Sequence, residues 1–418
     1  MYRDNVNSIS KGFDVQLVTI YIILMLIGWL AIFSSSHIPN GESVNIFNLQ
    51  TLYGKQIIWI GTSVILAIVI LILDNRIFQH LAYYIYIAAI LLMIIVLFVG
   101  TEIAGAKAWI KIGSYSIQPT EFAKFATALA LAKLFNEGKT KFQKRYLWLI
   151  AFFFILIPIG IIIAQKDTGS ALVFLSFILL FYREGMSGNI LLIGAAAIVL
   201  FILSFCLNEI YALAIVTTIF IIFWIIQRKF KKKLIRNGII YASAVIFIFS
   251  ANLLYDKILQ PHQKMRISTM LGQTSDPQGA DFNLNQSKIA IGSGGFWGKG
   301  YLKGTQTKLN FVPEQSTDFI FCSIGEEFGF LGSITILLLF SFLIYRILFL
   351  AERHRNSFVR YYGYGVASII FFHFIINIGM TIGLVPIIGI PLPFLSYGGS
   401  SLWGFTVLLF IFIRMQKS

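Results

Sequence analysis

Residues 17–32 read LVTIYIILMLIGWLAI, an apolar run with no charged side chain. Two more runs of this kind follow at residues 57–73 and 83–99. Each is close to the length of about 20 residues that crosses a bilayer as a helix. The runs are continuous rather than alternating, so they do not suit barrel strands, and helices are the other structure that satisfies backbone groups in lipid. The sequence therefore predicts an all-α, polytopic bundle of transmembrane helices.

The composition of the whole chain supports a membrane protein. Of its 418 residues, 57% are hydrophobic and 12% are charged, whereas soluble proteins carry charges at about a quarter of their positions. The formal net charge is +15, but the basic residues concentrate in short segments, at residues 139–145, 228–236, 353–360 and the C-terminal end. Such segments mark the cytoplasmic side of a membrane and attract anionic lipid heads, so membrane lipids and not nucleic acid are the expected partners.

Placing the basic segments in the cytoplasm gives a topology for the whole chain. We expect about 12 spans in one integral membrane domain, residues 1–418, in the cytoplasmic (inner) membrane with both termini cytoplasmic. The spans are predicted at residues 15–36, 55–73, 79–99, 119–138, 147–164, 170–183, 189–206, 211–227, 238–254, 331–350, 361–380 and 402–414. Residues 255–318, the longest stretch without a spanning run, become a large extracytoplasmic loop, and loops of that length are usually functional or disordered.

The segment QPTEFAK, residues 118–124, places Glu121 and Lys124 on one helical face. Ionisable side chains inside a membrane cost about 2.5–3.5 kcal/mol at a helix centre on insertion scales, which makes them functional candidates. A capped helix start is the alternative, because Glu121 suits the positive end of a helix and Lys124 would neutralise it. Lys124 lies deeper than a helix terminus, so we favour a buried pair that orients a polar site.

The segment PEQSTDFIF, residues 313–321, places Asp318 at the boundary between a polar loop and an apolar run. An acid at such a boundary can act as a general base, because burial raises the pKa of its carboxyl group. Asp318 is therefore the residue that we expect to abstract a proton. Helix capping is the alternative, since aspartate is a preferred N-cap residue. Two further acids, Glu326 and Glu327, follow.

Two glycine-rich segments and the histidines were considered as further sites. The segment PLPFLSYGGSS, residues 391–401, offers hydroxyls and a backbone that could cradle phosphate, although a simple turn before a span would look similar. The segment IGSGGFWGKG, residues 291–300, is not expected to bind a nucleotide, because it does not lie between a strand and a helix. No metal site is expected from the five scattered histidines, and His373 within a span is expected to be packed or hydrogen-bonded.

Taken together, four separated motifs resemble the SEDS family of peptidoglycan polymerases, which contains RodA, FtsW and SpoVE. The matching segments are GAKAWI (105–110), QPTEFAK (118–124), PEQSTDF (313–319) with GEE (325–327), and PFLSYGGSS (393–401). They occur in order over most of the chain. The sequence LNFVPEQ at residues 309–315 is more similar to the RodA branch than to FtsW.

The resemblance implies a glycosyltransferase that joins lipid II units outside the cytoplasmic membrane in cell elongation and shape maintenance. Asp318 would deprotonate the 4-hydroxyl of the acceptor sugar, which displaces undecaprenyl pyrophosphate from the donor in a single inverting step. Cationic side chains would stabilise the leaving pyrophosphate. Besides Asp318, the residues expected to bind substrate are Glu121, Lys124, Trp109, Lys107, Arg266, Lys299, Glu327, Ser396 and Tyr397. Expected partners are a class B penicillin-binding protein, which crosslinks the glycan, and the cell-elongation machinery.

The sequence departs from the family pattern in two places. The family usually has about ten spans, so one hairpin is additional here, most simply within residues 189–227. Residues 165–169 read QKDTG where the family usually has Gln-Pro-Asp-Leu-Gly. A division-branch polymerase, a lipid-precursor flippase or transporter, and a non-catalytic scaffold stay open as alternatives. The sequence does not decide whether a divalent cation assists.

Overall fold

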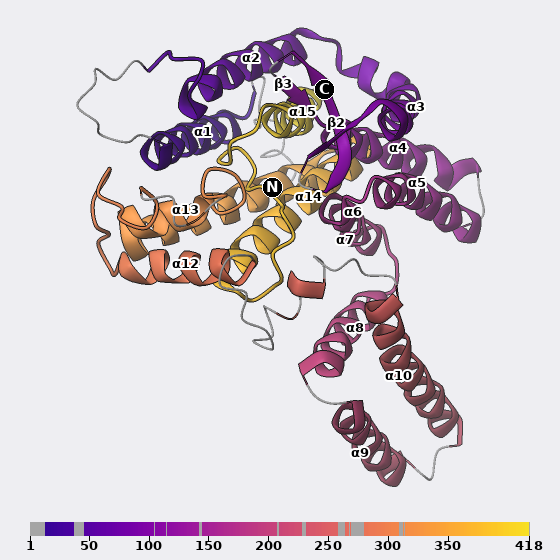
Figure 1. Cartoon of the computed structure of the whole chain (residues 1–418). Coiled ribbons are helices and arrows are strands. Elements are labelled where there is room, and N and C mark those ends of the chain that lie inside the picture. The colour runs from indigo at the N-terminus through magenta and orange to yellow at the C-terminus, as the bar shows by residue number, and fades with distance from the viewer. Residues whose placement is uncertain are drawn as a thin grey trace, which may run out of the picture. The chain divides into compact units, whose positions relative to one another are not determined.

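The computed structural model describes residues 13–36, 46–103, 105–113, 115–141, 144–206, 209–227, 231–257, 264–266, 268, 280–308, 312 and 314–417. The chain forms two compact units, one of residues Met1–Glu184 with Phe282–Ser418 and one of residues Gly185–Asp281. The first unit holds α1 (Val15–Ser36), α2 (Leu52–Ile72), α3 (Asn75–Val99), α4 (Pro119–Lys141), α5 (Lys144–Ala164), α6 (Thr168–Phe174), α7 (Phe177–Arg183), α12 (Ala280–Ser293), α13 (Ile320–Arg353), α14 (Ser357–Ile382) and α15 (Gly399–Met415) (Figure 1).

The predicted helical membrane fold is confirmed. Seven helical segments of the described chain are long and apolar enough to cross a membrane, in α1, α2, α3, α5, α9 (Glu209–Gln227), α13 and α14. Four shorter apolar stretches are Thr168–Arg183, Asn189–Phe201, Asn237–Ser250 and Gly399–Met415. Together with α4 these coincide with the expected spans, although the expected span 170–183 is broken into α6 and α7. The protein is an integral membrane protein.

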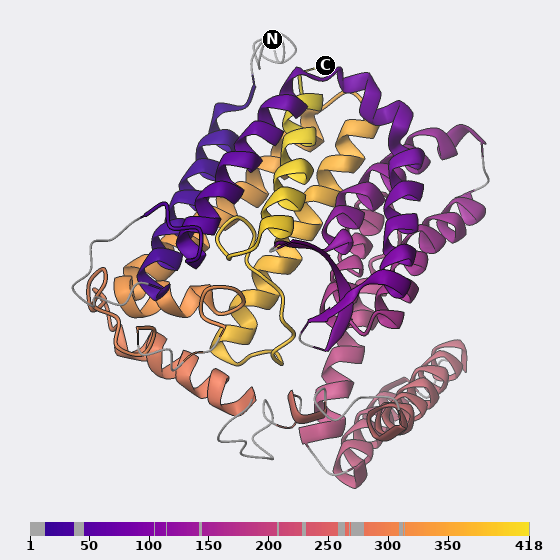
Figure 2. The same ribbon diagram turned by 45° about the horizontal axis from the view of Figure 1, so that its top comes forward.

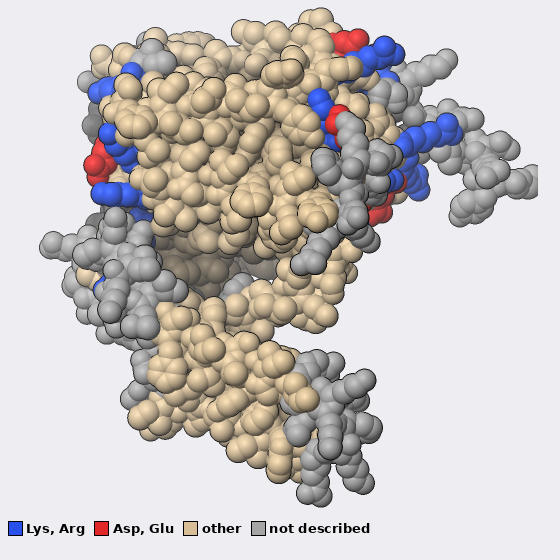
Figure 3. Space-filling view, turned by 90° about the vertical axis from the view of Figure 1, so that its right-hand side faces the viewer, with Lys and Arg blue, Asp and Glu red and all other residues tan. Residues whose placement is uncertain are grey.

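The outside of the first unit has the surface that a lipid environment requires. The helix α3 exposes large apolar side chains along its length, such as Tyr84, Leu91 and Phe98. On the face shown in Figure 3, charged side chains gather at opposite edges and leave a broad belt between them almost without charge. A belt of this kind matches the hydrocarbon layer, because an unpaired charge there is costly.

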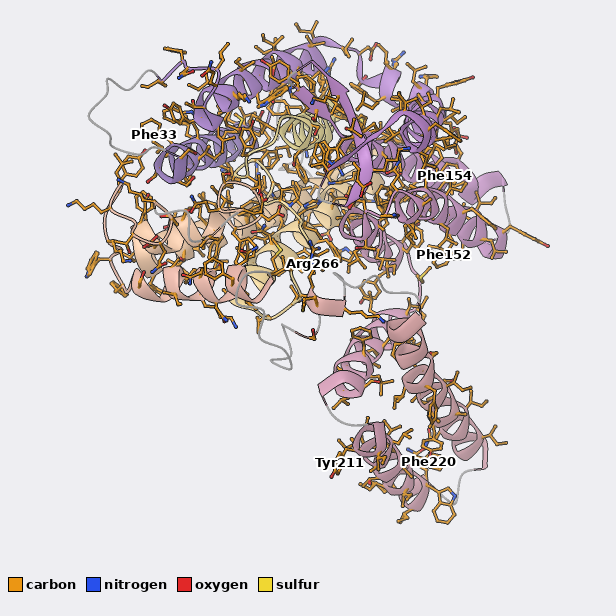
Figure 4. All side chains as sticks on the ribbon, in the orientation of Figure 1. Phe33, Phe152, Phe154, Tyr211, Phe220 and Arg266 are labelled. Carbon is orange, nitrogen blue, oxygen red and sulfur yellow. The ribbon has the colours of Figure 1, made fainter. Side chains whose placement is uncertain are left out.

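The helix α4 lies inside the first unit rather than at its surface. It packs against α3, α5, α14 and α15, and its residues 126–132 are all buried. On the neighbouring α5, Phe154 packs on Tyr86 with ring centroids 4.8 Å apart, and Phe152 lies against Phe181 at 5.3 Å (Figure 4). Because protein and not lipid surrounds α4, this helix can carry polar side chains at membrane depth.

A small sheet lies between α3 and α4, where the all-α expectation had no strands. Strands β1 (Thr101–Ile103), β2 (Ala106–Ile112) and β3 (Tyr115–Ile117) form an antiparallel sheet in the order β1-β2-β3. The sequence AKAWIKI of β2 alternates small or apolar with longer side chains, which is the period of a strand. Gly113, with a φ of +61°, makes the turn into β3. The alternation was the signal that could have predicted this sheet.

The start of α1 and the end of α15 lie at one end of the first unit (Figure 2). Near the start, Asp14 forms an ion pair of 2.6 Å with Arg346 of α13. The ammonium group of Lys417 lies 4.7 Å from the centre of the Phe13 ring. The sheet, α12 and the segment between α14 and α15 lie toward the opposite end of this unit.

The second unit consists chiefly of three helices, α8 (Asn189–Cys206), α9 (Glu209–Gln227) and α10 (Lys231–Lys257). Phe220 of α9 stacks on Tyr241 of α10 with ring centroids 4.5 Å apart, and the Thr217 and Tyr241 hydroxyls are 3.1 Å apart. Tyr211 and Phe220 both project from α9 (Figure 4). The expected additional hairpin, residues 189–227, is therefore helical and belongs to this unit.

Replacing Gly28 by alanine is expected to destabilise the protein. A Cβ atom at Gly28 of α1 would lie 2.5 Å from the carbonyl oxygen of Leu395, so α1 or the segment before α15 would have to shift. Overpacking of this kind costs about 1–3 kcal/mol. Gly61 of α2 is the matched control, because a Cβ atom there has nothing within 4 Å. Thermal unfolding in detergent should show a lower Tm for Gly28→Ala and no loss for Gly61→Ala; equal Tm values would contradict the close packing.

Candidate functional site

Hydrogen bonds link three segments of the first unit, directly or through α14. They are the start of α4, the residues that precede α13, and the turn between α14 and α15. The backbone N–H of Tyr397 donates to the carbonyl of Ser316 over 2.8 Å, which joins the second segment to the third. These segments contain five of the ten residues that the sequence singled out, namely Glu121, Lys124, Asp318, Ser396 and Tyr397.

Glu121 and Lys124 form a buried ion pair. The Lys124 ammonium donates to Glu121 Oε1 over 2.7 Å, and the side chains are 4% and 3% exposed. Glu121 Oε2 has no hydrogen-bond partner among the described residues. A surface helix cap would leave both groups in solvent, so the geometry favours the buried pair over capping alone. Such a pair is held by its mutual attraction and by its other hydrogen bonds.

His373 of α14 is the third member of this cluster. Its Nε2 accepts from the Lys124 ammonium over 3.0 Å, and its Nδ1–H donates to the Pro391 carbonyl over 3.0 Å. The Phe405 ring lies against both, 4.7 Å from the His373 ring and 5.0 Å from the Lys124 ammonium. The sequence predicted that His373 is packed or hydrogen-bonded, which is confirmed. It gave no signal that His373 pairs with Lys124, because the two positions are far apart in the chain.

Asp318 lies directly before α13 and is half-buried. The N-cap position of α13 belongs to Phe319, so Asp318 does not occupy it. The Asp318 carbonyl accepts from the Asn377 side chain over 2.8 Å. Its carboxylate lies beside Gly389, where an added Cβ atom would be 3.3 Å from Oδ2. Asn377 thus fixes the backbone of Asp318, and the Asp318 carboxylate lies beside a residue without a side chain.

The turn that contains Ser396 and Tyr397 is fastened to the backbone before Asp318. The Ser396 hydroxyl donates to the Thr317 carbonyl over 2.6 Å and accepts from the Leu392 N–H over 2.8 Å. The amides of Ser396 and Tyr397 also bond to protein carbonyls. These bonds favour a structural turn over a phosphate cradle of backbone amides. Burial raises the pKa of the Tyr397 phenol, which keeps it a neutral hydrogen-bond donor.

Glu326 holds the loop before α13 in place. It is fully buried, and its oxygens accept from Lys299 over 2.7 Å and from the backbone and hydroxyl groups of residues 305–307. Its neighbour Glu327 is 2% exposed and accepts from the Ser34 hydroxyl and from the Leu302 N–H. Lys299 and Glu327 are therefore engaged within the protein, and their contact with substrate stays a prediction.

Two more of the predicted residues, Lys107 and Trp109, share one face of strand β2 and are both partly exposed. The Lys107 ammonium donates to the Phe98 carbonyl over 3.3 Å, and its backbone N–H donates to the Gln165 carbonyl. Arg266 belongs to the second unit, and its contact with substrate also stays a prediction. Among the described residues, no group of three or more His, Cys, Asp or Glu side chains could hold a metal ion.

The departure at residues 165–169 has a structural counterpart. Asp167 caps α6 by accepting from the Ser170 N–H, and it also accepts from the Gln118 side chain over 2.7 Å. Lys166 has a φ of +63°, which proline cannot adopt. Asp167 therefore makes its contacts beside a backbone conformation that a proline at residue 166 could not adopt.

Comparison with known proteins decides the family. A family model for FtsW, RodA and SpoVE, described as "Cell cycle protein", matches residues 15–221 and 212–418. The chain belongs to the FtsW/RodA/SpoVE family. The family resemblance carried by the four motifs is confirmed.

The relatives and solved structures agree with this family. The chain is 33% identical to the peptidoglycan glycosyltransferase RodA of Treponema pallidum, over 94% of this chain and 95% of that protein. It is 32% identical to the peptidoglycan glycosyltransferase MrdB of Escherichia coli, over 93% and 89%. The crystal structure of Thermus thermophilus RodA shares the fold, with a TM-score of 0.62, 23% identity and 98% coverage of both chains. A peptidoglycan synthase complex contains a chain with a TM-score of 0.70, 24% identity and the same coverage.

Removing Lys124 is expected to destabilise the protein much more than breaking an exposed ion pair. The variant Lys124→Met leaves Glu121 buried without its partner, at a cost of about 3–5 kcal/mol. Replacing both residues, with Glu121→Gln added, should regain much of the loss. Glu352→Gln is the control, since the Arg183–Glu352 pair is about half exposed and is worth about 0–1 kcal/mol. Unfolding in detergent measures all three; a Lys124→Met protein as stable as the control would contradict the role of the pair.

Proposed function

We propose that this protein is a peptidoglycan glycosyltransferase that polymerises lipid II into glycan strands on the extracytoplasmic face of the cytoplasmic membrane. The observation that carries the proposal is the position of Asp318. This acid is half-buried at the edge of the bundle, its backbone is fixed by Asn377, and the Ser396–Tyr397 turn is fastened beside it. The proteins named peptidoglycan glycosyltransferase that match over nearly the full chain support the same activity.

The chemistry that we assign to the site is one inverting substitution. The Asp318 carboxylate takes the proton of the acceptor 4-hydroxyl, and that oxygen attacks the anomeric carbon of the donor. A new carbon–oxygen bond forms as the bond to undecaprenyl pyrophosphate breaks, and the pyrophosphate leaves with the electron pair. One base is sufficient, and no covalent enzyme intermediate is needed.

The leaving pyrophosphate carries the largest charge in this reaction and needs cations. Lys124 and Lys299 already donate to carboxylates of the protein. Lys107 is partly exposed on β2, and among the described residues its ammonium contacts just the Phe98 carbonyl. We therefore assign Lys107 as the first choice for a pyrophosphate ligand, with Trp109 beside it on the same strand face.

The charge distribution supports an orientation with both termini in the cytoplasm. Arg346, Arg414 and Lys417 lie near the end of the first unit that holds the start of α1 and the end of α15, where Arg414 donates to the Leu73 carbonyl. Basic residues favour the cytoplasmic side. The opposite end, with Asp318, then faces the extracytoplasmic side, where lipid II is polymerised.

A class B penicillin-binding protein is the partner that we propose, within the cell-elongation machinery. The support is the solved complex, whose description concerns coordination of polymerization and crosslinking by a peptidoglycan synthase. The elongation role rests on the RodA and MrdB relatives. A division role is the alternative, since a Haemophilus influenzae protein named as a probable FtsW is 29% identical.

Replacing Asp318 by asparagine is expected to lower the rate of polymerisation strongly. Loss of a general base lowers a rate by about 10²- to 10⁴-fold. Purified protein would be supplied with lipid II, with and without the crosslinking partner, and the products separated on a gel that resolves glycan strands. Glu314→Gln is the matched control, because Glu314 is an exposed acid in the same segment that bonds the Thr317 hydroxyl.

Two results would contradict this proposal. Glycan from Asp318→Asn at the wild-type rate would exclude Asp318 as the base. Wild-type protein that moves labelled lipid II across vesicle membranes and makes no polymer would favour a flippase.

A further inference from the structure

Two buried polar side chains, one turn apart on α14, connect the ion pair of α4 with the segment that carries Asp318. His373 is 1% exposed and Asn377 is fully buried. Their spacing places them on one helical face, and that face bonds to Ile390 and Pro391 of the turn that follows α14.

The contacts of His373 fix its protonation. A lysine ammonium can only donate, so the ring nitrogen that faces Lys124, Nε2, is an acceptor. A backbone carbonyl can only accept, so the nitrogen that faces Pro391, Nδ1, carries the proton. His373 is therefore a neutral ring that joins a charged group on one side to the backbone of the turn on the other.

Asn377 uses its amide group in the same way. Its Nδ2 donates to two carbonyls, those of Ile390 and Asp318, each over 2.8 Å. One NH2 group thus fastens the turn and the backbone of the acid to the same point of α14. Gly389, the residue before Ile390, lies against the Asp318 carboxylate.

We propose that His373 and Asn377 are positioning residues, which couple the Glu121–Lys124 pair to the orientation of the Asp318 carboxylate. The path runs from Lys124 through the His373 ring to Pro391, along the turn to Gly389, and back through Asn377 to the Asp318 backbone. A shift of the ion pair moves the turn, and the turn sets the position of the base. This inference rests on the proposed function, because it assigns the coupling to the reaction that Asp318 performs.

A purely structural role is the alternative. In that case the two side chains would hold the turn on α14, and their loss would lower stability without a specific effect on the chemical step. The distinction requires variants that break one connection at a time and a measurement that separates kcat from KM.

Two substitutions at His373 break opposite sides of the path. The side-chain amide of His373→Asn matches Nδ1 and can still donate to Pro391, but it does not reach Lys124. The side-chain carbonyl of His373→Gln matches Nε2 and can still accept from Lys124, but the donor to Pro391 is lost. Asn377→Ala removes both bonds of the second anchor. Ser368→Ala is the matched control, because Ser368 is buried on α14 and, within the part of the chain that the structure describes, bonds to the Tyr364 carbonyl of its own helix alone.

The experiment measures lipid II polymerisation by the purified full-length protein, with the Tm of each variant. Both His373 variants and Asn377→Ala should lower kcat by about 10- to 100-fold with KM changed less than about twofold, since a small misplacement of a reacting group costs that much. Ser368→Ala should keep the wild-type kcat. The double variant Glu121→Gln with His373→Asn should have a kcat only slightly below that of the more impaired single variant, because both changes break one path.

Three outcomes would overturn the proposal. They are a wild-type kcat in a folded His373→Asn or His373→Gln protein, losses of kcat that follow Tm in all variants and in Ser368→Ala alike, and losses that multiply in the double variant. A wild-type protein that makes no glycan would overturn the proposed function and this inference with it. Polymerisation by the wild type with unaffected variants would overturn the inference alone.

Discussion

The buried pair between Glu121 and Lys124 is the interaction on which the rest of the site depends. An unpaired charge at this depth in a membrane protein is costly, so the Glu121 carboxylate and the Lys124 ammonium each stabilise the other. The pair forces α4 into the interior, where α3, α5, α14 and α15 surround it. It also leaves one ammonium donor that bonds to His373 of α14. A single electrostatic requirement thus ties the inner helix to the segment that carries the acid.

Most of the conspicuous carboxylates at this end of the molecule are used to build it. Glu326 binds the loop of residues 299–307, Glu327 binds α1 through Ser34, and Asp167 joins the start of α6 to Gln118. Irregular backbone near a membrane needs such bonds, because its polar groups must be satisfied within the protein. Asp318 differs from these acids in being half-buried and in lying beside a glycine. This difference in surroundings, and not residue type, separates the proposed base from the structural acids.

The close contacts that glycine allows complete the arrangement. α1 approaches the turn before α15 at Gly28, and Gly404 of α15 lies against the Glu121 backbone. Gly329, with a φ of +61°, bends α13 so that the loop of residues 295–298 can bond alongside it. The functional end of the protein is therefore fixed by backbone contacts as much as by side chains, and small changes of volume there are expected to move the site.

The sequence by itself determined the membrane-helix fold, the approximate positions of the spans, the family, and the segments in which Asp318, Glu121 and Lys124 lie. These features depend on local composition and on short motifs, both of which are visible in the sequence alone. It did not predict the sheet at residues 101–117, although the alternation in β2 was visible. Only the tertiary structure decided that Glu326 and Lys299 bind each other, that Ser396 fastens the backbone before Asp318, and that His373 and Asn377 connect α4 with that acid. These partners are distant in the chain, and a hydrogen bond between them depends on how helices pack, which no local pattern of residues encodes.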